Sequence, residues 1–345
     1  MKMSKGTKTH HDMCGACTNV SLEHTPEGFP QPGEIAEKIL SKNPDWSKLH
    51  NMIAVAISRR DKLWSEYAEN KEVQNMEKVV LFDMDGTITP PRKKITREMT
   101  RKLADLSKVA HIGIVTGSGY DYLIQQCQDM WYEIGSVPSS SITLLPCNGT
   151  QVYKPDATGR FTASHKVDMR QELGDEVLNT VMTCLTHMQF LHTFNKPPHS
   201  LTGHFISYRD SMINWCPVGR NANNEQREEF IKFDTETGAR LMAKDMIQKY
   251  LALYGIENVV LALGGSTSID IFPEGWDKTY ALQHFQGKDC WFVGDSCGVN
   301  GNDRTIYEAL KQKDQAFVTS GPEETLEIID KITESIQRGK NEVGS

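Results

Sequence analysis

The sequence predicts an α/β protein: a doubly wound parallel sheet with an inserted α+β domain and a helical extension in front of it. Three observations carry this prediction. The 345 residues exceed the usual size of a single domain, which is about 100–150 residues. From Met76 onward, short apolar segments alternate with amphipathic ones, as is typical of parallel strands joined by helices on both faces of a sheet. From about 165 to 274 this alternation stops, which indicates an insertion.

The expected parts are an N-terminal extension at 1–76, a core at 77–164 and 275–345, and the inserted domain at 165–274. Thr96 marks a helix start because its hydroxyl can accept a hydrogen bond from a free amide of the first turn. The core is expected to contain strands at 78–82, 111–115, 291–293 and 316–318, and helices at 96–106, 120–129 and 322–338. Ligands of such sheets bind at the carboxyl ends of the strands.

The insertion and the extension are each expected to hold helices. For the insertion we expect a helix at 173–188, a strand pair within 204–215, two charged helices, and strands near Val259 and Ile269. In the extension, residues 47–70 carry apolar side chains at spacings of three and four, which predicts an amphipathic helix. Roughly the first 30 residues lack an apolar face and are expected to form a tail.

Composition and charge narrow the class of protein. Hydrophobic residues make up 38% and charged residues 24%, which suits a soluble globular protein and excludes a fibrous or disordered chain. The net charge of −7 does not favour binding to the negatively charged backbone of a nucleic acid. No apolar run approaches the roughly 20 residues that span a membrane. Eight cysteines, scattered except for Cys14 and Cys17, favour a reducing compartment. We therefore expect a cytoplasmic protein without nucleic-acid or membrane partners.

Two carboxylates follow the first predicted strand, in the segment Asp83-Met84-Asp85-Gly86-Thr87. Both face the mouth of the sheet only if the chain leaves the extended conformation there, which Gly86 permits. A carboxylate nucleophile beside a second carboxyl group is the arrangement that forms an aspartyl phosphate while the neighbour moves the leaving-group proton. Asp-Gly alone is also a turn signal, but the preceding strand favours the catalytic interpretation. Two anions and a phosphate together require a cation.

This segment resembles the first motif of the haloacid dehalogenase superfamily of phosphotransferases, and three further segments follow in the superfamily's order. The resemblance implies that Thr116 and Ser118 hold the transferring phosphoryl group and that Lys278 supplies a cation for its oxygens. Taken alone, Thr116 is equally consistent with a helix cap, and Lys278 with a surface lysine. The implied catalytic residues are Asp83, Asp85, Thr116 and Lys278, and the implied Mg²⁺ ligands are Asp83, Asp85, Asp295, Asn302 and Asp303.

A narrower resemblance, to the eukaryotic-type phosphomannomutases, covers residues 78 to about 332. It is carried by the segments Thr89-Pro90-Pro91-Arg92-Lys93-Lys94-Ile95-Thr96, Asn148-Gly149, Arg209-Asp210-Ser211-Met212-Ile213-Asn214, Pro217-Val218-Gly219-Arg220, Gly264-Gly265, Ser268-Ile269-Asp270-Ile271-Phe272-Pro273 and Gly275-Trp276-Asp277-Lys278. The family would make the core Rossmann-like and the insertion a cap over it. It implies that Arg209, Arg220 and Ser268 bind the distal phosphate. Asp270 would contact sugar hydroxyls, and Arg92 would reach in from the core.

The resemblance implies a phosphohexose mutase that interconverts mannose 6-phosphate and mannose 1-phosphate, a reaction that feeds GDP-mannose biosynthesis. Asp83 would be phosphorylated from a hexose 1,6-bisphosphate activator, with Mg²⁺ as cofactor. Asp85 would protonate the departing sugar oxygen and later deprotonate the accepting hydroxyl. The implied partners are small-molecule sugar phosphates and a second copy of the chain, bound through the cap. The motifs do not distinguish mannose from glucose.

Several alternatives stay open at this point. Thr202 stands where the family has a third phosphate-binding arginine, and Thr116-Gly117 stands where the mutases tend to have two glycines. A Mg²⁺-dependent sugar-phosphate phosphatase on the same scaffold is therefore the second hypothesis. A third is a catalytically silent binding module, against which the intact acidic residues argue. Arg209 and Arg220 are also consistent with surface ion pairs in a hairpin.

The extension lies outside the resemblance and has one feature of its own. His10, His11, Cys14 and Cys17 together offer zinc-ligand chemistry. No second cysteine pair or spaced histidine pair follows to complete a site, so idle residues in a tail are the alternative. The predicted helix at 47–70 is expected to serve packing or assembly.

Overall fold

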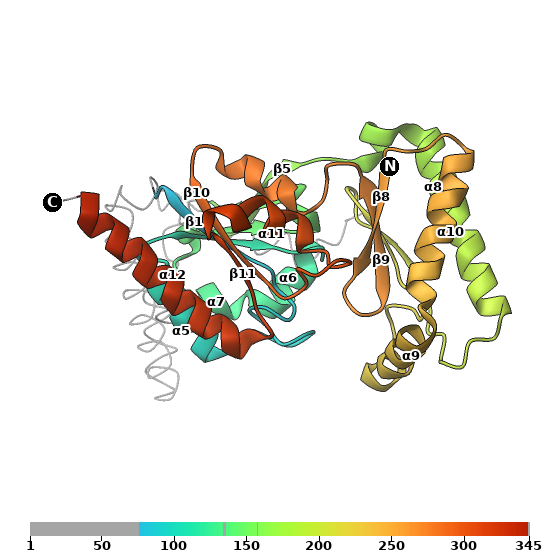
Figure 1. Ribbon diagram of the computed structural model, residues 1–345, viewed down its shortest axis with the longest axis horizontal. Coiled ribbons are helices and arrows are strands. Elements are labelled where there is room, and N and C mark those ends of the chain that lie inside the picture. Colours follow the sequence, from blue (N-terminus) through green and yellow to red (C-terminus); the bar gives the residue numbers. More distant parts are fainter. Residues whose placement is uncertain (1–75, 134–135, 157, 344–345) are drawn as a thin grey trace, which may run out of the picture. The chain divides into compact units, whose positions relative to one another are not determined.

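The computed structural model describes residues 76–343, apart from 134–135 and 157, and the side chains up to Arg338 (Figure 1). The helix predicted at 47–70 and the histidine and cysteine group at 10–17 lie outside the described residues.

The larger of two sheets has seven strands in the order β11-β10-β1-β2-β3-β4-β5. The five strands from β11 to β3 are parallel, whereas β4 and β5 run antiparallel to their neighbours. The strands are β1 (Lys78–Phe82), β2 (His111–Val115), β3 (Ile142–Leu145), β4 (Gln151–Pro155), β5 (Phe161–Lys166), β10 (Asp289–Gly294) and β11 (Ala316–Val318). The chain adds β2 and β3 on one side of β1 and returns on the other side, so the direction of winding changes between β1 and β10.

Helices cover both faces of this sheet because alternate side chains of its strands point to opposite faces. Val80 and Phe82 of β1 join one apolar cluster with α5, α6, α7 and α12. Val79 and Leu81 join the other with η3 and α11. The helices are α5 (Arg97–Leu106), α6 (Tyr120–Cys127), α7 (Asp129–Tyr132), α11 (Arg304–Leu310), α12 (Pro322–Val343) and the 3₁₀ segments η1 (Ser139–Ser141), η2 (Cys147–Gly149), η3 (Lys278–Phe285) and η4 (Lys311–Lys313).

Most predicted core elements are confirmed. β1, β2 and β11 have the predicted bounds, and Thr96 caps α5 by accepting a hydrogen bond from the Met99 amide at 3.2 Å. The helix predicted at 120–129 ends at Cys127 instead, and a separate turn, α7, follows. The strands β3, β4 and β5 were not predicted. β5 is largely exposed, so it lacks the apolar alternation by which a strand is recognised.

The smaller sheet has four antiparallel strands in the order β6-β7-β9-β8. They are β6 (Ile206–Tyr208), β7 (Ile213–Trp215), β8 (Val259–Gly264) and β9 (Ser268–Pro273), and the accompanying helices are α8 (Met169–Phe194), α9 (Asn224–Thr237) and α10 (Ala239–Leu253). One cluster of buried residues joins the sheet to α8 and α10, and Figure 1 shows these two helices side by side. The predicted strand pair and the two charged helices are confirmed, while α8 extends beyond 173–188 at both ends.

Two features of the described part of the chain bear on its environment. None of its helices combines the length and the apolar character that a membrane crossing requires. Its six cysteines are all free thiols and all buried, so the fold of these residues uses no disulfide.

We expect acid to weaken the fold through His111, the first residue of β2. Its Nε2 lies 2.8 Å from Thr143 Oγ1, and burial, with the nearby charges of Lys154 and Lys288, lowers its pKa from 6.5 to about 4. In the unfolded chain this histidine binds a proton below about pH 6.5, whereas in the folded chain it does so only below about pH 4. The free energy of unfolding therefore falls as the pH drops through this range.

The test is urea unfolding of the wild type and His111→Gln at pH 7.5 and 5.0. Between these two pH values the wild type should lose on the order of 1 kcal/mol more than the variant. Equal losses would show that another group is responsible.

Candidate active site

Three residues predicted for the site lie at the carboxyl edge of the larger sheet. Asp83 follows β1, Thr116 follows β2 and Asp295 follows β10. These strands are parallel neighbours, so their ends meet at one edge. Since the direction of winding changes between β1 and β10, Asp83 and Asp295 flank the position where such sheets bind ligands.

Lys278 lies at the centre of this edge. Its side chain is fully buried, and its ammonium group contacts Oδ1 of Asp83 and Oδ1 of Asp303. A surface lysine is therefore the wrong interpretation of this residue. Asp303 is fully buried as well, and its Oδ2 accepts a hydrogen bond from the Ser296 amide at 3.0 Å.

The charges of this group do not balance. One oxygen from each of Asp83, Asp295 and Asp303 lies within 4.8 Å of the others. Burial raises the pKa of Asp83 well above its usual range against the opposing effect of Lys278, and the other two carboxylates raise it further. Burial and Asp303 raise the pKa of Asp295 to about 6. Burial disfavours the charge on Lys278, but the two carboxylates that it contacts outweigh burial and raise its pKa. The ammonium is therefore charged, and one positive charge faces three carboxyl groups.

This imbalance fits a divalent cation. Clustered carboxylate oxygens are the ligands that hard cations such as Mg²⁺ prefer, and a cation would stabilise all three in their ionised form. Asn302 is half-buried in the turn before Asp303, and its side chain makes no hydrogen bond to the described residues. The side chain of Asp85 is not part of the carboxylate cluster. Of the groups of this residue, only the main chain therefore remains as the predicted Mg²⁺ ligand.

The side chain of Asp85 is held by residues outside the carboxylate cluster. Its Oδ1 accepts hydrogen bonds from the Arg92 amide at 2.9 Å and from Gln126 Nε2 at 3.2 Å. Gln126 is buried, and its Oε1 accepts a hydrogen bond from Thr89 Oγ1 at 2.9 Å, so the amide has one orientation. Arg92 adopts a φ of 62°, a costly conformation for a residue with a side chain. Sequence reasoning missed Gln126, although a glutamine on the core side of α6 was a signal.

Thr116 is placed by its loop and does not cap a helix. Its buried Oγ1 accepts a hydrogen bond from the Ser118 amide at 3.1 Å, while the N-cap residue of α6 is Gly119. The helix-cap alternative for Thr116 is therefore wrong. Ser118 is half-buried in the same loop.

Arg209 lies in the turn between β6 and β7, and Arg220 lies in the segment after β7. Arg209 Nη1 donates to the Gly117 carbonyl at 2.7 Å, and Arg220 Nη1 donates to Asn214 Oδ1 at 2.7 Å. Burial, and next the charge of Arg209, lower the pKa of Arg220. Within the described residues neither arginine has a carboxylate partner in an ion pair, so the surface ion-pair alternative is wrong. The two guanidinium groups are partly buried and repel each other, while the charge of Asp270 acts in the opposite direction.

A further arginine, Arg227, was not predicted. It lies in the first turn of α9, where burial and the charge of Arg92 lower its pKa, and its side chain makes no hydrogen bond or ion pair with the described residues. Arg92 in turn reaches the Ala222 carbonyl, with its Nη1 at 3.4 Å. A positively charged side chain in the first turn of a helix is unfavourable beside the helix dipole. This position was the signal in the sequence that could have singled out Arg227. Thr202 donates its hydroxyl to the Val218 carbonyl at 3.0 Å, which accounts for its side chain without a ligand.

Asp270 and Ser268 lie on β9 beside these arginines. Asp270 is buried and its Oδ1 accepts a hydrogen bond from Asn214 Nδ2 at 2.6 Å. Burial raises its pKa against the opposing effect of Arg209. A methyl group added at Gly117 would lie 3.2 Å from Asp270 Oδ2, so this carboxylate faces the loop that holds Thr116. Ser268 Oγ donates to the Gly264 carbonyl at 2.6 Å.

Comparison with known proteins agrees with this geometry. Residues 99–335 match the model of a family described as eukaryotic phosphomannomutase. The chain is 32% identical to a phosphomannomutase of Solanum lycopersicum, over 72% of this chain and 91% of that protein. It is 31% identical to a phosphomannomutase of Saccharomyces cerevisiae, over 77% and 98%. The IMP-bound, N-terminally truncated IMP-nucleotidase of Plasmodium falciparum is similar in fold, with a TM-score of 0.52 at 16% identity over 77% of this chain and 70% of that one. With the sheet order, these findings confirm the predicted fold class.

We expect Gly86→Ala to damage the carboxylate cluster. Gly86 has a φ of +87°, and an added methyl group would lie 2.5 Å from Asp295 Oδ2, so Asp295 must move. The measurement is the increase in melting temperature on addition of MgCl₂, which should be smaller in the variant than in the wild type.

The matched control is Gly287→Ala, because Gly287 has a similar φ of +78° but nothing within 4 Å of the added methyl group. It shares the backbone strain, which is about 1 kcal/mol or more, and should keep the response to MgCl₂. The same response in both variants would contradict a role for the close approach to Asp295.

Proposed function

Because the chain belongs to the eukaryotic phosphomannomutase family, we propose that it interconverts mannose 6-phosphate and mannose 1-phosphate through an aspartyl phosphate on Asp83. One observation carries this proposal. Near the lysine and carboxylate centre lie two pairs of arginines, Arg209 with Arg220 and Arg92 with Arg227, whose charges repel within each pair. None of the four forms an ion pair with a carboxylate of the described residues. Phosphoryl transfer at Asp83 needs only one phosphate. A second group of guanidinium forks supports a second phosphate on the same substrate.

Asp83 and Asp85 divide the chemistry between them. A carboxylate oxygen of Asp83 attacks the phosphorus, the bond from phosphorus to the sugar oxygen breaks, and Asp85 gives that oxygen a proton. In the return step a hydroxyl at the other end of the sugar attacks the phosphoryl group on Asp83, and Asp85 takes the hydroxyl proton. Gln126 and the Arg92 amide orient Asp85 for both steps.

The remaining groups of the centre stabilise charge. Lys278 and the loop at Thr116 bind the transferring phosphoryl oxygens in this proposal. Mg²⁺ would be held by Asp83, Asp295 and the main chain at Asp85, supported by Asn302 and Asp303, and when bound it offsets the charge that keeps an anionic nucleophile from a phosphate.

The arginines hold the phosphate that does not react. Arg209, Arg220 and Arg227, with Ser268, bind it in the proposal, while Asp270 contacts sugar hydroxyls and Arg92 approaches from the core. A hexose 1,6-bisphosphate primes Asp83 and turns over within the site, so that either end of the sugar faces Asp83. Because the return step requires a sugar rather than water, the buried position of Asp83, 6% exposed, favours transfer over hydrolysis.

Three further expectations from the sequence are part of the proposal. Residues 165–274 act as the cap over a core at 77–164 and 275–345, with 1–76 as an extension. The enzyme works in the cytoplasm on small-molecule sugar phosphates. Two copies associate through the cap.

The direct test is an assay of the purified chain with mannose 1-phosphate and Mg²⁺, with and without hexose 1,6-bisphosphate. We expect mannose 6-phosphate to form, faster with the bisphosphate, and little free phosphate. Asp83→Asn is the control and should form neither product, because the amide has the same shape but is a far weaker nucleophile. Free phosphate as the main product, independent of the bisphosphate, would establish a sugar-phosphate phosphatase instead.

We also expect Arg220→Ala to separate isomerisation from hydrolysis. Removing a charge-assisted fork from a buried phosphate costs about 2–5 kcal/mol, which corresponds to a loss of isomerisation of roughly thirtyfold to several thousandfold. Hydrolysis of p-nitrophenyl phosphate should change little, since this substrate has no distal phosphate. Arg227→Ala should behave in the same way. An unchanged rate of isomerisation in both variants would remove the arginines from the substrate site.

A further inference from the structure

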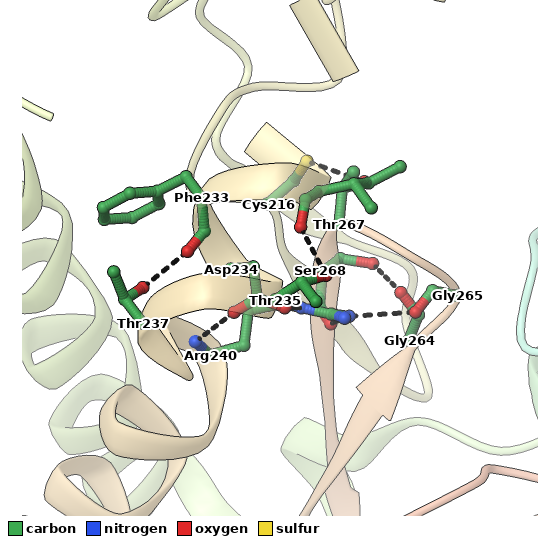
Figure 2. Close-up of polar contacts among 11 residues, drawn as sticks. Cys216, Phe233, Asp234, Thr235, Thr237, Arg240, Gly264, Gly265, Thr267 and Ser268 are labelled. Atoms are coloured by element: carbon green, nitrogen blue, oxygen red, sulfur yellow. Dashed lines mark hydrogen bonds and ion pairs between the residues drawn. The ribbon is translucent and has the colours of Figure 1, made fainter. Parts of the chain in front are cut away.

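Arg240 and Asp234 form a partly buried ion pair at the junction of α9 and α10 (Figure 2). Arg240 Nε lies 2.7 Å from Asp234 Oδ2, and the Arg240 amide donates to Asp234 Oδ1 at 2.7 Å. Their side chains are only 11% and 12% exposed. Gly238, between the helices, adopts the left-handed conformation that lets α9 end and α10 begin. Asp234 thus fixes both the guanidinium plane and the start of α10.

The free edge of the guanidinium binds the turn between β8 and β9. Arg240 Nη1 donates to the Gly265 carbonyl at 2.9 Å and to the Ser268 carbonyl at 3.2 Å, as Figure 2 shows. Ser268 Oγ closes the same turn onto the Gly264 carbonyl. Arg240 therefore holds both sides of this short turn and ties it to the start of α10.

This turn leads directly into two residues of the substrate site. Ser268 is the first residue of β9, and Asp270 follows two residues later on the same face of the strand. Gly264 lies beside Asp270, since a methyl group at Gly264 would be 2.6 Å from Asp270 Oδ2. A shift of the turn would therefore displace Ser268 directly and would reach Asp270 through its close approach to Gly264.

The other end of the connection lies on α9. Arg227 and Asp234 are seven residues apart, so they lie on nearly the same face of the helix, about 10 Å apart along its axis. Between them Phe230 is buried in a small cluster with Cys216, Val218 and Ala222, which anchors the middle of this stretch of helix. If the helix tilts about Phe230 when the contact at Asp234 is lost, Arg227 moves as well.

We infer that Asp234 and Arg240 are positioning residues for the distal phosphate: they fix the turn that carries Ser268 relative to the helix that carries Arg227. Neither residue touches the substrate. They act by fixing the distance between Ser268 and Asp270 on β9 and Arg227 on α9. The inference rests on the proposed function and deepens it.

The arrangement requires an arginine at position 240. A guanidinium can pair with a carboxylate through one edge and donate to carbonyls through another, whereas a lysine ammonium is a point charge without a fixed plane. Arg240→Lys keeps the charge opposite Asp234 but loses the simultaneous hold on Gly265 and Ser268. Asp234→Asn keeps the shape of the side chain and one acceptor oxygen but removes the negative charge. It therefore tests the carboxylate partner of the pair.

The test compares wild type, Arg240→Lys, Asp234→Asn and Lys249→Gln. Lys249 is the matched control, since it makes an exposed ion pair with Asp245 on α10, 2.7 Å long, with side chains 75% and 61% exposed. We expect KM for mannose 1-phosphate to rise about tenfold to a hundredfold in the first two variants, with kcat changed much less. The rate of p-nitrophenyl phosphate hydrolysis should stay within about twofold of wild type, and Lys249→Gln should match wild type throughout.

Two outcomes would overturn the inference. An unchanged KM in both variants would show that the turn holds its position without Arg240. A parallel fall in isomerisation and in aryl phosphate hydrolysis would show that the pair serves only stability. If Arg240→Lys does not fold, Asp234→Asn decides.

The inference can also be judged apart from the proposed function. If the wild type forms no mannose 6-phosphate, the proposed function has failed, and the readout becomes calorimetric binding of mannose 1-phosphate to each protein. Arg240→Lys and Asp234→Asn must then weaken this binding by about tenfold or more. Equal affinities in all four proteins would overturn the positioning role as well.

Discussion

The candidate active site depends on the burial of one ammonium group, that of Lys278. A fully buried lysine is stable only if carboxylates compensate its charge, and removing one partner of such a pair costs about 3–5 kcal/mol. The partners come from the end of β1 and from the turn after β10, as Asp83 and Asp303. The ammonium group is compensated only if β1 and β10 are neighbours in the sheet. Its burial therefore favours this strand order, in addition to the packing of the apolar faces. Asp295 then adds the negative charge that a divalent cation is suited to balance.

The described site has two regions of opposite charge. Carboxyl groups exceed cations at the carboxyl edge of the larger sheet, whereas the arginines repel each other in two pairs, Arg209 with Arg220 and Arg92 with Arg227. In the proposed function a cation would balance the first region and a phosphate the second. A sugar with a phosphate at each end would then place one phosphate in each region, which is how a mutase could hold its substrate.

Sequence reasoning identified what depends on local pattern and missed what depends on distant contacts. β1, β2 and the residues Asp83 and Asp295 follow from apolar runs and the motifs behind them. Gln126 acts 41 residues away from Asp85, and Arg240 acts 25 residues away from Gly265, so no spacing in the sequence indicates either contact. Arg227 carried a weak local signal, its place in the first turn of a helix, but only the fold shows that its charge faces Arg92.

The contact of Arg209 with the Gly117 carbonyl joins the two regions directly. A neutral carbonyl is a weaker partner for a guanidinium than a phosphate is, because charge-assisted hydrogen bonds are roughly twice as strong as neutral ones. In the proposed function Arg209 would therefore exchange Gly117 for the distal phosphate with a net gain. The loop that carries Thr116 would keep its place in this exchange, because the Asn148 amide donates to the Thr116 carbonyl and the Cys147 amide donates to the Ser118 carbonyl. Binding at the distal position would thus leave the loop at Asp83 ready for the transferring phosphoryl group.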